Sequence, residues 1–148
     1  MREHMGLYRG KRIDNGEWVE GNLIVFRRNV DDEYWCIVQM PTGYGAFEAY
    51  KFTYEVDPNT VGEYVGRLDK NNNPIFEGDI VDASNEWWYA AGPAGHTSPL
   101  IAVLWDEGCC CFEPFGLYDC DCGVYISARN CKVIGNIYDN PELWEDEH

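Results

Sequence analysis

Short runs of bulky apolar residues alternate with polar turn signals along most of the chain. Residues 7–13 and 17–26 flank Asp14-Asn15-Gly16. Because an Asn-Gly pair readily adopts the positive φ values of a tight turn, this pattern predicts a β-hairpin. Residues 46–56 place bulky side chains at every second position, which predicts a further strand. Similar runs predict strands over 34–40, 64–68, 74–81, 100–105, 124–127 and 132–138.

Helical signals are scarce outside the C-terminal region. Asn140-Pro141-Glu142 combines an N-cap residue type, a first-position proline and an early acid, which predicts a short helix. The chain is therefore expected to be mainly β, with small barrel-like, SH3-like antiparallel sheets and a short C-terminal helical turn. Its 148 residues predict a single domain. Within it we expect an N-terminal β part over about 1–62 and a small-barrel part over about 63–148.

An insertion over about 85–99 interrupts the second part. It contains Trp87, Trp88 and Tyr89, followed by a run rich in small residues, Gly and Pro. Adjacent residues on a strand point to opposite faces, so both faces would have to be covered to bury the two tryptophans. Two interpretations stay open: a second packed layer, or a contact with a subunit or partner, since aromatic residues are enriched in interface cores.

The charge balance limits the classes of partner. The net charge is −15, which disfavours direct nucleic-acid binding because phosphate backbones repel an acidic surface. The charge is uneven: residues 1–28 hold six basic and four acidic side chains, and the other 120 residues hold five basic and 22 acidic ones. No apolar run approaches the length of a membrane span or a secretory signal, so a cytoplasmic location without membrane contact is expected.

The seven cysteines suggest reduced thiols in the cytoplasm, because an odd number leaves at least one unpaired within a monomer. Cys109 and Cys111 lie two apart, as do Cys120 and Cys122, and four converging thiolates would suit tetrahedral zinc. Structural zinc sites usually place two to four residues between paired cysteines, whereas here there is one. Buried free cysteines are the preferred interpretation, with a cysteine-bound zinc module as an alternative.

Catalytic patterns find little support. Of three histidines only His96 lies away from the termini, and nothing in the sequence orients it against a thiol. No serine sits in a Gly-x-Ser-x-Gly setting. We therefore expect no enzyme activity and no cofactor.

Four stretches of the chain carry a family resemblance. They are residues 1–21, with Tyr8-Arg9-Gly10-Lys11-Arg12 and Trp18-Val19-Glu20-Gly21; residues 56–81, with Asp57-Pro58-Asn59 and Glu77-Gly78-Asp79; residues 103–106; and residues 133–143, with Ile134-Gly135-Asn136 and Asn140-Pro141-Glu142. In order and spacing these stretches resemble the YopX family of bacteriophage and prophage proteins over nearly the whole length. The resemblance implies a single YopX-like domain, a mainly β fold, a phage or prophage origin and a bacterial cytoplasmic location. It implies no reaction, cofactor or catalytic residue.

The motif residues have structural interpretations. Gly78 permits a bend that a Cβ would hinder, and Asp79 can accept backbone N–H groups at a turn. Gly62 and Gly135 are also expected to serve backbone geometry, and Asn140 and Pro141 to begin the helix.

Three hypotheses for function follow. The preferred one is a non-enzymatic phage or prophage accessory protein that binds protein, either a host or phage protein or further copies of itself as a homo-oligomer. The charge asymmetry and Trp87-Trp88-Tyr89 motivate it. The alternatives are a DNA mimic that inhibits a host nucleic-acid-binding protein, and the zinc module.

Overall fold

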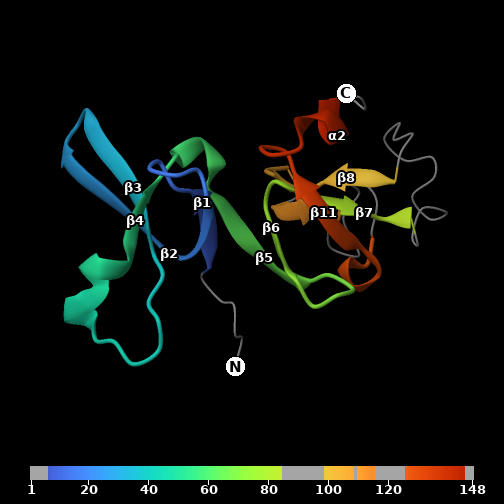
Figure 1. Cartoon of the computed structure of the whole chain (residues 1–148). Coiled ribbons are helices and arrows are strands. Elements are labelled where there is room, and N and C mark those ends of the chain that lie inside the picture. The colour runs from blue at the N-terminus through green and yellow to red at the C-terminus, as the bar shows by residue number, and fades with distance from the viewer. Residues whose placement is uncertain (1–6, 85–98, 109, 116–125, 146–148) are drawn as a thin grey trace. The chain divides into compact units, whose positions relative to one another are not determined.

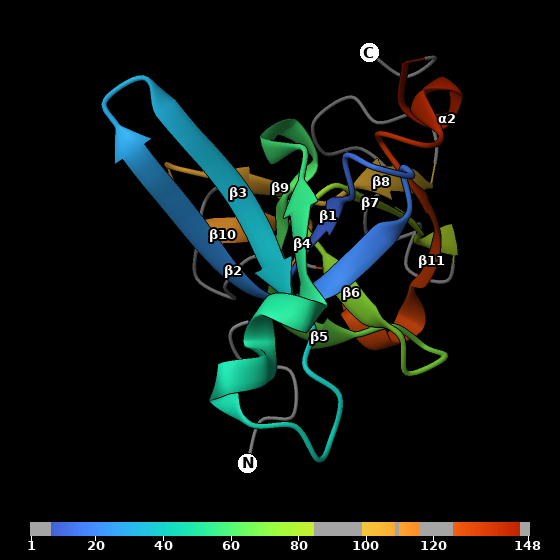
Figure 2. The ribbon, with the colours of Figure 1, turned by 60° about the vertical axis from the view of Figure 1, so that its left-hand side comes forward.

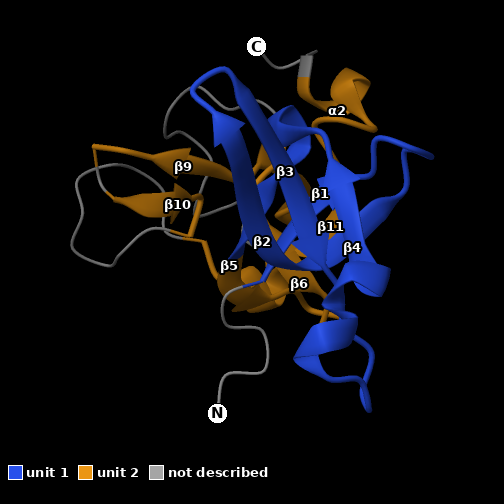
Figure 3. Ribbon diagram, turned by 90° about the vertical axis from the view of Figure 1, so that its left-hand side faces the viewer, with its two compact units in different colours: residues 1–64 blue, residues 65–148 orange. Residues whose placement is uncertain are grey.

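A computed structural model describes residues 7–84, 99–108, 110–115 and 126–145. The chain divides into two compact units, unit 1 over Met1–Tyr64 and unit 2 over Val65–His148, which Figure 3 distinguishes by colour. The described residues form three antiparallel sheets and few helices, so the predicted mainly β fold is confirmed (Figure 1). Within this part of the chain, no helix is both long and apolar enough to cross a membrane.

Unit 1 contains one antiparallel sheet with the order β4-β3-β2-β1-β5. Its strands are β1 (Tyr8–Lys11), β2 (Trp18–Asn29), β3 (Asp32–Val38), β4 (Thr53–Val56) and the start of β5 (Gly62–Leu68). The predicted first hairpin is confirmed, because β1 pairs antiparallel with β2 and Gly16 has φ 72° in the turn between them. Strand β2 extends three residues beyond the predicted end, to Asn29.

Gly21 allows β2 and β3 to approach each other at the base of their hairpin. A Cβ on Gly21 would lie 2.2 Å from the carbonyl oxygen of Val38. The core of unit 1 sits beside this point and consists of Val19, Ile37 and Val56. The motif glycine at position 21 is therefore fixed by close packing of two backbones.

The prediction of one strand over 46–56 is wrong for its first seven residues. Ala46–Phe52 forms a 3₁₀ helix, η1, and only Thr53–Val56 pairs with β3. Tyr50, which belonged to the predicted alternation, is largely exposed. The reason is that β3 ends at Val38, opposite Thr53, so the residues before Thr53 have no strand beside them there.

The sheet of unit 1 curls so that the end of β1 meets β4. Arg12 and Val56 form an isolated bridge, and the Ile13 N–H donates to the Glu55 carbonyl oxygen at 3.0 Å. The short η2 helix (Pro58–Thr60) follows β4, and its Thr60 hydroxyl accepts the Lys11 N–H at 2.9 Å. No closed barrel is formed by the sheets of the described residues, so the SH3-like barrel predicted over about 63–148 is not confirmed.

Unit 2 is built from shorter strands. Strand β5 continues into it and lies next to β6 (Pro74–Phe76). A three-stranded sheet has the order β11-β7-β8, from β7 (Asp79–Asp82), β8 (Leu100–Ala102) and β11 (Lys132–Asn136). A two-stranded sheet pairs β9 (Leu104–Asp106) with β10 (Cys111–Glu113). The short η4 helix (Ala128–Asn130) precedes β11, and the predicted terminal helix is confirmed as α2 (Pro141–Glu145).

Three strand predictions in unit 2 need correction. The expected single strand over 74–81 is two strands, β6 and β7, because the chain turns at Gly78 between them. The expected single strand over 100–105 is two strands in different sheets, with Val103 between them. Val103 is fully buried, and its N–H and carbonyl groups bond to Asp79 and Gly78. Of the predicted strand over 124–127, residues 126 and 127 are not in a strand, and the other two lie outside the described residues. The core of unit 2 centres on Ile75, Val81, Ile101, Ile126 and Cys131.

Candidate functional site

The turn between β6 and β7 contains the motif Glu77-Gly78-Asp79. Gly78 has φ 92°, and a Cβ there would lie 3.0 Å from the Tyr138 ring. The buried Asp79 carboxylate accepts the Phe76 N–H at 2.8 Å. Both residues therefore shape a turn, as their types predicted.

A second turn joins β11 to α2. The Asn136 side-chain oxygen accepts the N–H groups of Tyr138 and Asp139, and the Asn140 side-chain oxygen accepts the Asn136 N–H at 3.3 Å. A Cβ on Gly135 would lie 2.3 Å from that Asn140 oxygen. The glycine thus leaves room for the Asn140 side chain, which points back to the strand, while Pro141 begins the helix.

A third turn, between β5 and β6, depends on Asp69. This fully buried carboxylate accepts the N–H groups of Asn71, Asn73 and Val133 at 2.8 to 3.0 Å. Burial alone would raise its pKa, but these hydrogen bonds outweigh burial and lower it. The available signal was an aspartate that opens a five-residue polar turn. We call these three segments the polar turns of unit 2.

The remaining structural glycine, Gly62, is the first residue of β5. It is buried and lies opposite Arg9 of β1. Its place in the pairing agrees with a role in backbone geometry rather than in a ligand site.

The cysteine candidates are only partly described. Cys111 is buried at the start of β10, whereas Cys109, Cys120 and Cys122 lie outside the described residues. Where the structure describes the chain, no three metal-ligating side chains gather. The proposed four-cysteine zinc site stays a prediction. Cys36 and Cys131 are buried, as expected for core residues.

The partner-binding candidates Trp87, Trp88 and Tyr89 also lie outside the described residues. Their two interpretations, a packed layer or a partner contact, both stay open.

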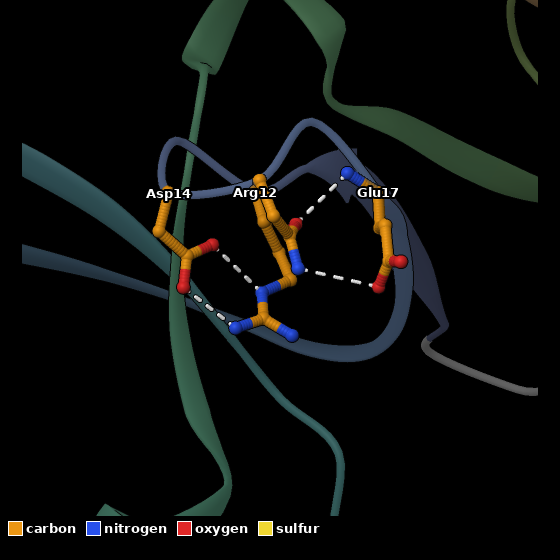
Figure 4. Close-up of polar contacts among 4 residues, drawn as sticks. Arg12, Asp14 and Glu17 are labelled. Carbon is orange, nitrogen blue, oxygen red and sulfur yellow. Dashed lines mark hydrogen bonds and ion pairs between the residues drawn. The ribbon is translucent and has the colours of Figure 1, made fainter.

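The basic side chains at positions 9, 11 and 12, in and just after β1, contact acidic and aromatic groups of unit 1. Arg12 donates through Nε and Nη2 to the Asp14 carboxylate at 2.9 and 2.6 Å (Figure 4), and its guanidinium lies 4.4 Å from the centre of the Tyr54 ring. The hydrogen bond to Asp14 raises the pKa of Arg12, and the same bond lowers the pKa of Asp14. Arg9 and Lys11 both lie over the Trp18 ring. The positive charges of Arg9, Lys11 and Arg12 are therefore engaged in contacts within unit 1.

The β9–β10 hairpin of unit 2 presents one exposed tryptophan. Trp105 contacts Phe112 edge to face, with ring centres 4.9 Å apart. Burial, and then a hydrogen bond with Asp106, raise the pKa of Glu113. These contacts lie within one hairpin.

One candidate binding surface lies on the hairpin of β2 and β3, residues 22–38, which we call the long hairpin. Strand β1 pairs only with Trp18–Gly21 of β2, and β4 pairs only with Trp35–Val38 of β3. The hairpin is therefore a ribbon that projects beyond β1 from Asn22 onward and beyond β4 at residues 26–34, and Figures 1 and 2 both show its projecting end.

Apolar side chains are exposed on both faces of this ribbon. Alternation places Ile24 and Phe26 on one face and Val25 on the other, and these three side chains are 40%, 39% and 41% exposed. Val30 at the tip is 92% exposed. Sequence reasoning recognised the strand but not the exposure, because an apolar run is expected to be buried.

Polar contacts fix the shape of the ribbon near its tip. Arg27 bonds to the Glu33 carboxylate, which also accepts the Trp35 ring N–H at 2.8 Å. The bond from Trp35 and then those from Arg27 lower the pKa of Glu33. On the other face Phe26 stacks on Tyr34, with ring centres 5.3 Å apart, and Arg28 lies over the same ring. A pre-ordered surface loses less entropy on binding than a flexible one.

Fold and site together define a mainly β protein with a projecting apolar ribbon and with its motif residues engaged in turns. The family model described as YopX protein matches residues 7–145, and the chain belongs to the YopX family. No curated protein matches it significantly. Among solved structures it is similar to the crystal structure of protein EF1440 from Enterococcus faecalis, with 21% identity over 92% of this chain and 95% of that chain and a TM-score of 0.46.

Proposed function

We propose that this protein is a non-enzymatic accessory protein of a phage or prophage that acts in the bacterial cytoplasm by binding protein, and that the long hairpin is its binding surface. The observation that carries the proposal is the ribbon itself, which exposes Ile24, Val25 and Phe26. When a partner removes an apolar surface of fixed shape from water, the free energy falls, and this favours binding. Membership of the YopX family supports a phage-type origin.

The absence of enzymatic activity is part of the same proposal. The buried Asp69 accepts the N–H groups of two residues in its own turn and of Val133 in β11, and the buried Asp79 accepts the N–H group of Phe76. Both carboxylates thus have a structural use that requires no substrate. The bound partner is either a further copy of this chain or a host or phage protein.

The test replaces the exposed apolar face of the ribbon. The double variant Ile24→Thr/Phe26→Thr keeps side chains that suit a strand but removes apolar area. Tagged wild type and variant are used to capture proteins from the bacterial host, with cross-linking before lysis. We expect the variant to lose the specific captured proteins, further copies of the chain included.

A matched control carries Ile13→Thr, in the turn after β1, where the isoleucine is 59% exposed. This variant should capture what the wild type captures. Far-ultraviolet circular dichroism checks that both variants keep their strands. If the double variant is folded and its captured proteins are unchanged, the long hairpin is not the binding surface.

A further inference from the structure

One edge of the long hairpin has no strand beside it in the described part of the chain. One edge of β2 pairs with β1, and only at residues 18–21. The opposite edge pairs with β3, at Asn22–Asn29. The register shifts between Arg27 and Asn29, which marks a bulge that ends the regular edge. Residues 23–27 therefore present a regular outer edge, in which Arg27 at one end is charged and proline, lysine and acidic residues do not occur. Natural proteins usually protect exposed edges with such residues.

We propose that this outer edge pairs antiparallel with the same edge of a second copy of the chain, around a two-fold axis at Val25. The proposal rests on the proposed function and names the partner of the same surface. In this arrangement Val25 lies opposite Val25 of the second copy, and Ile24 lies opposite Phe26. Apolar side chains thus meet on both faces, and the unpaired backbone groups of each edge gain partners.

Charge complementarity supports a second copy as the occupant. The chain has a net charge of −15, so two copies repel each other except where local contacts compensate. Arg28 lies just beyond the paired segment, on the face of β2 that also carries the exposed Glu20. Pairing around Val25 places Arg28 diagonally across from Glu20 of the second copy, within reach of long side chains. The two-fold axis generates this pair twice, while Arg27 keeps its own Glu33.

Neighbouring registers are less favourable. Pairing around Phe26 would set Ile24 opposite Arg28 and Val25 opposite Arg27, which places charges against apolar side chains. Pairing around Ile24 would set Asn22 opposite Phe26 and extend the second strand towards residues 20 and 21, whose edge β1 already occupies. The register around Val25 sets apolar residues opposite each other at its centre, Val25 with Val25 and Ile24 with Phe26, and places Leu23 opposite Arg27 only at its ends.

The test uses the symmetry of the proposed pairing. In Val25→Lys two lysines would lie opposite each other, and in Val25→Glu two glutamates would. Sedimentation velocity of the full chain across micromolar concentrations should show a dimer for the wild type. For each variant alone, the dissociation constant of the dimer should be higher than that of the wild type by about tenfold or more, because like charges directly opposite destabilise paired strands. An equimolar mixture of the two variants should restore the dimer through a lysine–glutamate pair.

Val30→Lys is the matched control, because Val30 is exposed at the tip and outside the paired segment. It should dimerise like the wild type. A wild type that stays monomeric at every concentration would overturn self-pairing, and so would variants that dimerise as well as the wild type. A mixture that stays monomeric would overturn the two-fold register. If self-pairing fails while Ile24→Thr/Phe26→Thr still loses captured proteins, the proposed function stands with a different partner.

Discussion

The polar turns of unit 2 and the long hairpin of unit 1 differ in which side chains they bury. In unit 2, Asp69 and Asp79 are buried and hydrogen-bonded to backbone N–H groups. In the long hairpin, Ile24, Val25 and Phe26 remain partly exposed. The usual expectation, polar outside and apolar inside, is reversed in both regions.

The contrast separates structural from functional signals. A carboxylate can be buried without a large cost only when it accepts hydrogen bonds. Asp69 and Asp79, whose burial would first suggest a catalytic role, therefore have a structural role. The exposed part of an apolar side chain adds nothing to the stability of the fold, but it can contribute to binding when a partner covers it. In this protein the conspicuous motif residues shape turns, and an ordinary strand carries the candidate binding surface.

The base of the long hairpin should be far more sensitive than its tip. In Gly21→Ala the new Cβ would collide with the Val38 carbonyl oxygen, so β2 and β3 would have to separate. We expect the free energy of unfolding to fall by about 4 kcal/mol, or folding to fail. Urea denaturation measures the change. Gly45→Ala is the control, because a Cβ there meets no atom within 4 Å. Equal stability of the two variants would contradict the close approach.

Asp69→Ala should give the next largest loss. It leaves the N–H groups of Asn71, Asn73 and Val133 without their acceptor. We expect a loss of about 3 kcal/mol in the free energy of unfolding. Asp57→Ala provides a graded comparison, because the Asp57 side chain accepts one N–H group, from Asn59, and its loss should cost about 1 kcal/mol. If both variants lose the same amount, Asp69 does not hold the turn.

Acid should remove the contribution of Asp69 in a defined direction. Its pKa is lower in the folded protein than in the unfolded chain, so protons bind the unfolded chain first. The contribution is therefore complete above the unfolded pKa of about 3.9 and is lost as the pH falls through the folded value. Thermal unfolding between neutral pH and pH about 3 should show a steeper fall for the wild type than for Asp69→Asn. Parallel curves would exclude this contribution.

Gly135→Ala should have an intermediate effect that depends on Asn140. The new Cβ would collide with the Asn140 side chain rather than with backbone, so we expect a loss of about 2 kcal/mol. In a double-mutant cycle, Gly135→Ala should cost less when Asn140 is already alanine, because the colliding oxygen has gone. Denaturation of the four proteins measures the coupling. Additive losses would show that another contact requires the glycine.

The tip of the long hairpin should tolerate change almost freely. Val30→Lys should alter the free energy of unfolding by less than about 0.5 kcal/mol, because the valine is 92% exposed. Urea denaturation at low protein concentration separates this effect from any association. A large loss would mean that the tip is buried against another part of the chain or against a second copy.

Local sequence signals predicted the elements whose geometry depends on neighbouring residues. Asp14-Asn15-Gly16 predicted the first hairpin, Asn140-Pro141 the last helix, and Gly78-Asp79 a turn, and all three are present. These signals work because turns and helix starts are set by the φ preferences and side-chain hydrogen bonds of a few adjacent residues. The family was likewise recognised from motif order along the chain.

Contacts between distant segments decided the rest. Residues 46–52 have the alternation of a strand but form η1, because β3 ends before it reaches them. Asp69 matters through Val133, which is 64 residues away in the sequence. Ile24, Val25 and Phe26 lie along an open edge of β2 because β1 pairs with this strand only as far as Gly21. The sequence by itself determined the local turns and the class of fold, whereas strand length, pairing and burial depended on which segments met in space, since long-range packing overrides local propensity.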